Sequence, residues 1–146
     1  MRQARRLFPF CLLGWAAGLP ACAQSFAPRL YAVATETAMP HLEENLRYAT
    51  THAILCLGPA QLATAFPILR HEALKGCKLD HERKVDAAAS LVLSCAARSG
   101  TTGTAHWQVD GAAIHGTLEV KLGGKNMTFY QRISGRAIGD CLPDDG

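Results

Sequence analysis

Four cysteines, Cys56, Cys77, Cys95 and Cys141, have the clearest chemistry in this sequence. They are 21, 18 and 46 residues apart, whereas a four-thiolate zinc site typically uses closely spaced pairs such as Cys-x-x-Cys. In an oxidising compartment an even set of cysteines is instead typical of disulfides. We therefore expect two disulfides, for which three pairings are possible.

His106, His115 and Arg132 are the other candidate site residues. Two histidines that face each other across a hairpin can hold a metal ion, but Arg132 beside them would repel a cation. Arg132 and a protonated histidine could bind an anion instead. A solvated polar face is the simplest interpretation of these residues, so we expect no metal and no cofactor.

The first 23 residues have the pattern of a secretory signal peptide. Three arginines precede an apolar run at residues 7–19, and Ala21-Cys22-Ala23 fits a small-x-small cleavage site. Cleavage removes Cys11 and Cys22 and leaves the set of four cysteines. Lipidation of Cys22 is the alternative, because the preceding residues form a weak lipobox. We expect a periplasmic or secreted protein whose single domain spans residues 24–146.

The net charge of +3 comes from the leader. The whole chain has 15 Lys and Arg against 12 Asp and Glu, and loss of the three leader arginines leaves 12 of each sign. The remaining chain has no block of like charges, which argues against nucleic-acid partners. It also has no apolar run of about 20 residues, so we expect no transmembrane span after the leader.

Residues 101–134 predict three antiparallel strands. Two-residue hairpin turns are indicated between runs of β-prone alternation, at Asp110-Gly111 and Gly123-Gly124. Loops of two residues pair Val109 with Ala112 and Leu122 with Lys125.

This register predicts one apolar and one polar face. The expected core face carries Ala105, Trp107, Val109, Ile114, Leu118, Val120, Leu122, Met127, Phe129 and Ile133. On the polar face, His106, His115 and Arg132 form one row across the three strands. The next positions are Thr104, Thr117 and Tyr130, followed by Glu119 opposite Thr128.

The segments Arg29–Thr37 and Leu46–Ile54 are rich in β-prone residues and predict two strands around a Met39-Pro40-His41 loop. Residues 60–74 have apolar side chains at helical spacing and predict one short α-helix, which Pro67 should split or kink. The expected fold is all-β, with an antiparallel curved sheet or small barrel-like meander and this helix at its side.

A further hairpin favours one of the three disulfide pairings. If Lys78–Arg83 and Ala89–Cys95 are strands that turn near Asp86, Cys77 and Cys95 are equidistant from the turn and can face each other. This arrangement favours Cys77–Cys95 together with Cys56–Cys141, and the other two pairings remain open.

Several segments follow one another as they do in a known family. These are a Met-Pro loop in Thr35–Pro40, the string Thr50–Leu57 before the predicted helix, Cys77 and Cys95, and the string Ile133–Cys141 that ends in Gly-Asp-Cys. In this order the chain resembles a bacterial family called domain of unknown function 3617 over nearly all of its length after the leader. It departs at Leu30-Tyr31-Ala32-Val33, where the family has Gly-x-Trp. The resemblance implies an exported all-β domain and provides no catalytic residues.

We expect no enzymatic activity. No nucleophile-elbow pattern surrounds Ser94, Ser99 or Ser134, and cysteines in disulfides are not nucleophiles. The expected function is that of an exported, periplasmic module for interaction or envelope maintenance. The alternative is a carrier, in which the face of Trp107 and Phe129 encloses a small hydrophobic ligand in a barrel-like cavity.

Overall fold

The computed structural model describes residues 27–39, 48–96, 100–124 and 127–142, which form one antiparallel sheet of seven strands. The strands are β1 (Arg29–Ala38), β2 (Tyr48–Leu57), β3 (Cys77–Val85), β4 (Ala88–Cys95), β5 (Thr102–Asp110), β6 (Ala113–Leu122) and β7 (Met127–Gly139). Their order in the sheet is β2-β1-β7-β6-β5-β4-β3, with β2 and β3 at its edges. The expected all-β fold is confirmed as a curved sheet that does not close into a barrel.

Some of the predicted features lie outside the described residues. These are the leader at residues 1–23 and the positions of Pro40, His41, Leu46, Ser99 and Lys125. Within the described ranges, no helix is long and apolar enough to cross a membrane.

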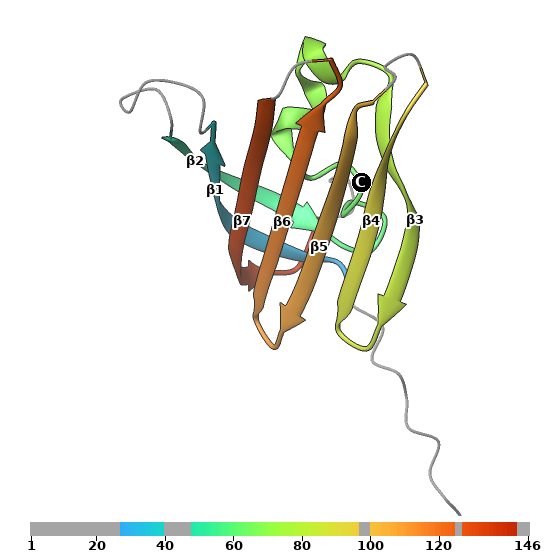
Figure 1. Ribbon diagram of the computed structural model, residues 1–146. Helices are drawn as coiled ribbons and strands as arrows, with labels where there is room; N and C mark the ends of the chain where they lie inside the picture. Colours follow the sequence, from blue (N-terminus) through green and yellow to red (C-terminus); the bar gives the residue numbers. More distant parts are fainter. Residues whose placement is uncertain (1–26, 40–47, 97–99, 125–126, 143–146) are drawn as a thin grey trace, which may run out of the picture.

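The sheet has an inner face that forms the core and an outer face that is open to solvent. Figure 1 shows β1 and β2 running obliquely behind the other five strands, with the connection 58–76 on the same side. Side chains from the strands and from this connection fill the inner face. The fully buried large ones are Tyr31, Phe66, Leu74, Ile114, Leu118, Val120 and Ile133. Burial raises the pKa of the Tyr31 hydroxyl above its usual value, against a smaller opposing effect of Arg29.

The α-helix predicted at residues 60–74 is wrong. Hydrogen-bonded turns come first, and two 3-10 helices follow: η1 (Pro67–Arg70) and η2 (Glu72–Leu74). Pro67 has no backbone N–H and disfavours a helical conformation at Phe66, which is extended with φ −78° and ψ 114°. The apolar residues of this segment still pack on the inner face, so the prediction of a buried side was correct.

Gln131 fastens the connection to the sheet. Although it lies on the inner face and is only 5% exposed, its side chain has two partners. The Oε1 atom accepts from the backbone N–H of Ile68 at 3.1 Å, and the Nε2 atom donates to Thr37 Oγ1 at 2.8 Å. One amide thus joins β7, η1 and β1 by hydrogen bonds in the core.

We expect Gln131→Leu to lower the free energy of unfolding by about 1–3 kcal/mol, because the buried N–H of Ile68 would lose its acceptor. Urea unfolding followed by circular dichroism measures this change. The matched control is Gln108→Leu on the exposed outer side of β5, which should stay within about 0.5 kcal/mol of the wild type. Equal stabilities of the two variants would contradict a structural role for the Gln131 amide.

The hairpin between β5 and β6 turns one residue later than predicted. Its loop is Gly111-Ala112, and Val109 pairs with Ile114. Only Gly111 has a positive φ, +57°, which fits a type II′ turn with glycine at its first central position. The predicted turn at Asp110-Gly111 is wrong, because a type I′ turn there would need positive φ at both residues. The partners shift by two residues, so every side chain keeps its predicted face.

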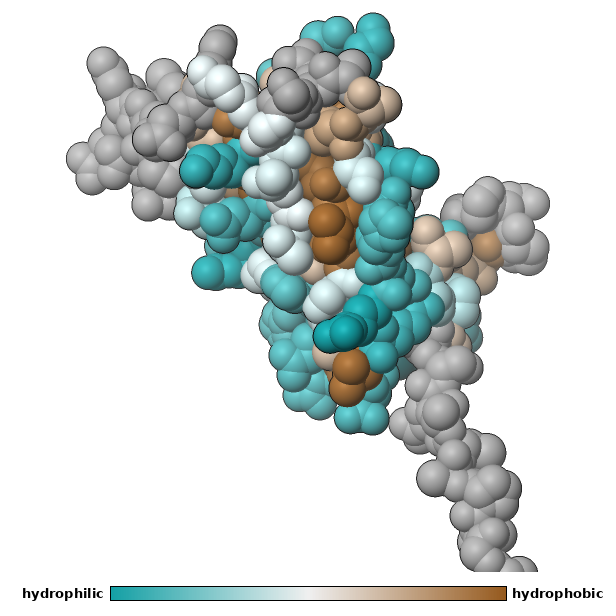
Figure 2. Space-filling model, turned by 45° about the vertical axis from the view of Figure 1, so that its right-hand side comes forward, coloured by the Kyte–Doolittle hydropathy of each residue, from teal (hydrophilic) through white to brown (hydrophobic). Residues whose placement is uncertain are grey.

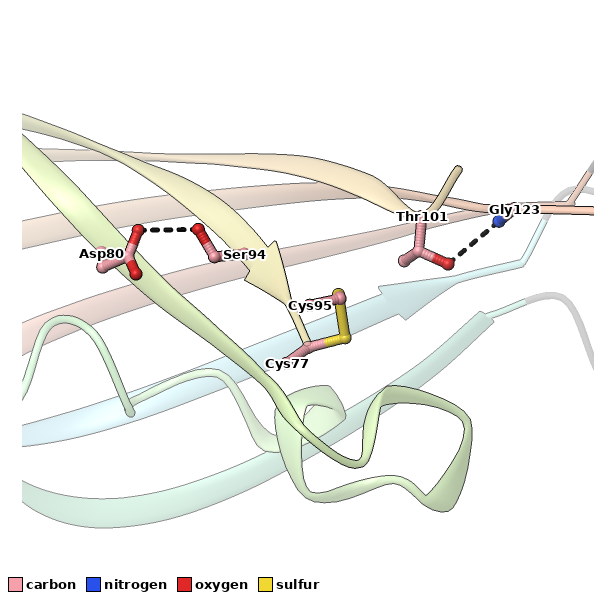
Figure 3. Close-up of a disulfide and its surroundings, with 6 residues drawn as sticks. All are labelled: Cys77, Asp80, Ser94, Cys95, Thr101 and Gly123. Carbon is pink, nitrogen blue, oxygen red and sulfur yellow. Dashed lines mark hydrogen bonds between the residues drawn. A yellow bond between two sulfur atoms is a disulfide. The ribbon is translucent and has the colours of Figure 1, made fainter. Parts of the chain in front are cut away.

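The hairpin between β6 and β7 also has a different register from the predicted one. Leu122 pairs with Met127, so the predicted partner Lys125 is wrong. The backbone N–H of Gly123 donates to Thr101 Oγ1 at 3.0 Å (Figure 3), a bond that links this loop to the start of β5. This shift is again two residues, and all ten residues of the predicted core face are buried or half-buried.

Both favoured disulfides are present. Cys77 and Cys95 are direct partners in the β3–β4 ladder, with Cα atoms 4.0 Å apart (Figure 3). Cys56 and Cys141 join β2 to the chain beyond β7, with Cα atoms 5.5 Å apart. The predicted hairpin is confirmed, since it turns at Asp86, which has a φ of +51°. The loop is Asp86-Ala87, and the register shift between Asp80 and Arg83 is what brings Cys77 opposite Cys95.

Candidate functional site

The corrected register separates the three predicted site residues. His106 lies opposite Thr117, and Thr117 lies opposite Arg132, so these side chains share one row of the outer face. His115 instead lies opposite Gln108 in the neighbouring row. The predicted row of His106, His115 and Arg132 is therefore wrong, because each hairpin pairs its strands two residues away from the expected register. The two histidines are diagonal neighbours and do not face each other.

The row that contains His106 and Arg132 continues into strands that the sequence did not connect to it. Ser90 on β4 pairs with His106, and Glu36 on β1 pairs with Arg132. Sequence reasoning missed both residues, because the β1–β7 and β4–β5 pairings were not predicted. In β4 the buried Leu91 and Leu93 alternate with Ser90 and Ser94, a signal that could have placed Ser90 on this face. In β1 the residues around Glu36 are all polar and give no such signal.

A hollow of about 310 Å³ lies on the outer face over this row. Its lining comes from strands β1, β5, β6 and β7 and includes the polar, exposed residues Glu36, Thr104, His106, Thr117, Glu119, Tyr130 and Arg132. We call these residues the outer hollow. Figure 2 shows a neighbouring side of the molecule, where hydrophilic and neutral surface is crossed by a narrow hydrophobic band.

Both signs of charge meet in the outer hollow. Arg132 Nη1 is 3.6 Å from Glu36 Oε2, and their side chains are 70% and 58% exposed. An ion pair this exposed contributes about 0–1 kcal/mol to stability, so both groups remain available to a ligand. Glu119 adds a second carboxylate and Tyr130 a half-exposed phenol. Such a mixed lining suits a polar partner with charges of both signs.

A serine and a histidine are hydrogen-bonded beside the outer hollow. Ser90 Oγ lies 2.9 Å from His106 Nδ1, and this contact is exposed to solvent. A serine nucleophile also needs a group that orients the base and donors for the oxyanion, and no described residue is hydrogen-bonded to the other ring nitrogen of His106. Among the described residues, no three His, Cys, Asp or Glu side chains are placed to hold a metal ion.

The outer face thus presents paired charges, hydroxyls and an aromatic ring on the surface of the sheet. Comparison with protein-family models, curated proteins and solved structures finds no match.

A second, more open hollow of about 770 Å³ lies farther along the outer face. Its lining includes the small residues Ala32, Ala34 and Gly135, together with His115. His115, the third predicted site residue, thus lies in a different depression from His106 and Arg132. The lining also contains His52, Ile54 and Arg136, and none of the described residues in it is acidic.

Proposed function

We propose that this chain is an exported, periplasmic protein that acts by binding, without catalysis, and that it belongs to the family called domain of unknown function 3617. The leader pattern and the resemblance support this proposal, and so do the two disulfides, which are typical of oxidising compartments. Its proposed role is interaction or envelope maintenance.

The observation that carries the proposal is the contrast between the two faces of the sheet. The inner face is filled by packed side chains, and Tyr31, Phe66 and Ile133 on it are each 0% exposed. The outer face presents a polar hollow to solvent. A ligand or partner therefore reaches the outer face without displacing the core, and we assign recognition to the outer hollow.

A carrier of a small hydrophobic ligand is the second candidate. The open hollow around Ala32, Ala34 and Gly135 favours it, because these small residues and the exposed side chain of Ile54 are part of its lining. This carrier would hold its ligand on the outer face, whereas the carrier expected from the sequence enclosed its ligand in a barrel-like cavity.

Native mass spectrometry of the protein purified from periplasm separates these candidates. We expect a chain that begins after Ala23 and is four hydrogens lighter before reduction than after it, with no small molecule retained. A retained mass of lipid size would favour the carrier. Lipid bound covalently to Cys22 would show that the protein is anchored to a membrane and is not free in the periplasm. Four free thiols would contradict export into an oxidising compartment.

Recognition by the outer hollow is tested by reversing its ion pair. In Glu36→Arg/Arg132→Glu the net charge and the ion pair are retained, but each charge changes place. We expect proteins cross-linked to the wild type in the periplasm to be recovered at least about tenfold less on this variant, which corresponds to roughly 1.4 kcal/mol of binding free energy.

The matched control reverses the exposed pair of Glu82 and Lys84 on β3, whose atoms are 3.1 Å apart. Glu82→Lys/Lys84→Glu should recover the same proteins as the wild type. If both charge-reversed variants recover the same amount of cross-linked protein, the outer hollow does not take part in recognition.

A further inference from the structure

The two edges of the sheet are built differently. Edge strand β3 carries five charged residues: Lys78, Asp80, Glu82, Arg83 and Lys84. Its pairing with β4 is interrupted between Asp80 and Arg83, where His81 has a φ of +53°. Charges and bulges on an edge strand prevent another strand from adding to it. The β3 edge is therefore protected.

Edge strand β2 has none of these features. Its ten residues include no charged residue, proline or glycine, and they pair with β1 in one unbroken register. Residues 49–54 are all exposed, although consecutive side chains of a strand point to opposite faces. Ile54 is 65% exposed. This half of β2 is thus uncovered on both faces, and in the described sheet no strand lies beyond it.

We propose that β2 pairs antiparallel with β2 of a second copy of this chain, joining two seven-stranded sheets across a twofold axis. The absence of charge favours a second copy over a strand of another kind, because a neutral strand placed beside itself brings no like charges together. In such a pair the same faces adjoin, and with the twofold axis at Ala53 the Ile54 side chain of one copy lies beside His52 of the other.

The protected β3 edge determines where this assembly stops. A chain with two unprotected edges would add copies without end, whereas this chain offers one open edge and one closed edge. Twofold pairing through β2 leaves only the charged β3 strands at both ends of the joined sheet. The assembly is therefore a closed dimer. Each outer hollow, formed by β1, β5, β6 and β7, remains outside the interface.

Sedimentation velocity of the oxidised, leader-free protein at about 1–100 µM tests the proposal. We expect a dimer in the wild type and no larger species. In the variant Thr51→Lys/Ile54→Lys, one added charge on each face of β2 should raise the dissociation constant at least about tenfold. The matched control Thr102→Lys/Gln108→Lys adds two charges to β5, which has a neighbour on each side, and should dimerise like the wild type.

Circular dichroism and the unreduced mass establish that each variant is folded and oxidised. Hydrogen exchange in the wild type should show protection of β2 that decreases on dilution. A wild-type monomer at the highest concentration would overturn the proposal, as would a dimer unaffected by Thr51→Lys/Ile54→Lys. Species larger than a dimer would refute closure at two copies. A monomer with another protein's segment bound to β2 would assign the edge to that partner instead.

Discussion

Loss of the Cys56–Cys141 disulfide is expected to lower the free energy of unfolding by about 4.5 kcal/mol, since it closes a long loop in the unfolded chain. The two cysteines are 85 residues apart in sequence. In the folded protein, Cys56 and Gly139 are both partners of Leu30, so the disulfide bridges the start of β1 and joins β2 to the chain after β7. A loss of this size approaches the whole stability of many small domains.

The Cys77–Cys95 disulfide should contribute less, about 3 kcal/mol, because its cysteines are only 18 residues apart. The two strands that it joins are also held by their own ladder of backbone hydrogen bonds. The order of the two effects is thus a consequence of loop length.

Urea unfolding of Cys56→Ala/Cys141→Ala and Cys77→Ala/Cys95→Ala, each without reductant, measures both losses. Replacement of both cysteines in each variant leaves no free thiol to form a wrong pair. If Cys77→Ala/Cys95→Ala is the less stable protein, loop closure does not govern the disulfide contribution. If the chain is exported as proposed, the amount that accumulates in the periplasm should follow the same order, with less Cys56→Ala/Cys141→Ala protein.

The sequence predicted those features that depend on alternation and symmetry. Side-chain alternation placed all ten core-face residues correctly, and it did so even though both hairpins were out of register, because a shift of two residues preserves the face. The equal distance of Cys77 and Cys95 from Asp86 predicted their pairing, although a register shift in β3 that the spacing does not reveal is what brings them opposite each other. Both arguments use local spacing alone.

Features that depend on one backbone angle or on distant strands were not predictable in the same way. The turn at Gly111 could have been of two types, and the type that forms moves His115 away from His106. Glu36 reaches Arg132 only because β1 pairs with β7 across most of the chain. The sequence therefore predicted His106 and Arg132 as residues of the candidate site. It did not predict Glu36 or Ser90, nor the geometry of the site.

The predicted helix failed for a local reason. Apolar residues recur at helical spacing in residues 60–74, yet Pro67 divides the segment into pieces too short for a stable α-helix. Packing of Phe66 and Leu74 against the sheet then provides the stability of the connection. Burial was predictable from the pattern, whereas the backbone conformation was decided by one proline.

Gly116 marks a close contact that alternation alone did not reveal. It is the direct partner of Trp107 across β5 and β6, and a Cβ atom there would lie 2.5–2.7 Å from three carbons of the indole ring. The ring cannot move aside easily, because it is 2% exposed and its centroid is 4.9 Å from that of Phe66. The indole thus covers the glycine, as aromatic residues do beside strand glycines.

We expect Gly116→Ala to lower the free energy of unfolding by about 2–3 kcal/mol, since a methyl group forced into a packed core displaces its neighbours. The matched control is Gly139→Ala at the end of β7, where a Cβ atom would have no neighbour within 4 Å and φ is not positive. That variant should be as stable as the wild type or slightly more stable, because alanine loses less backbone entropy on folding than glycine.

A double-mutant cycle identifies the indole as the cause. Trp107→Ala alone should cost about 3–5 kcal/mol through the cavity that it leaves. In that background Gly116→Ala should cost nearly nothing, because the ring that it would strike is gone. If Gly116→Ala costs the same with and without Trp107, the close approach of the ring does not explain the glycine. Strong coupling between the two sites would show that the indole ring, which the register of β5 and β6 places opposite Gly116, is what excludes a side chain there.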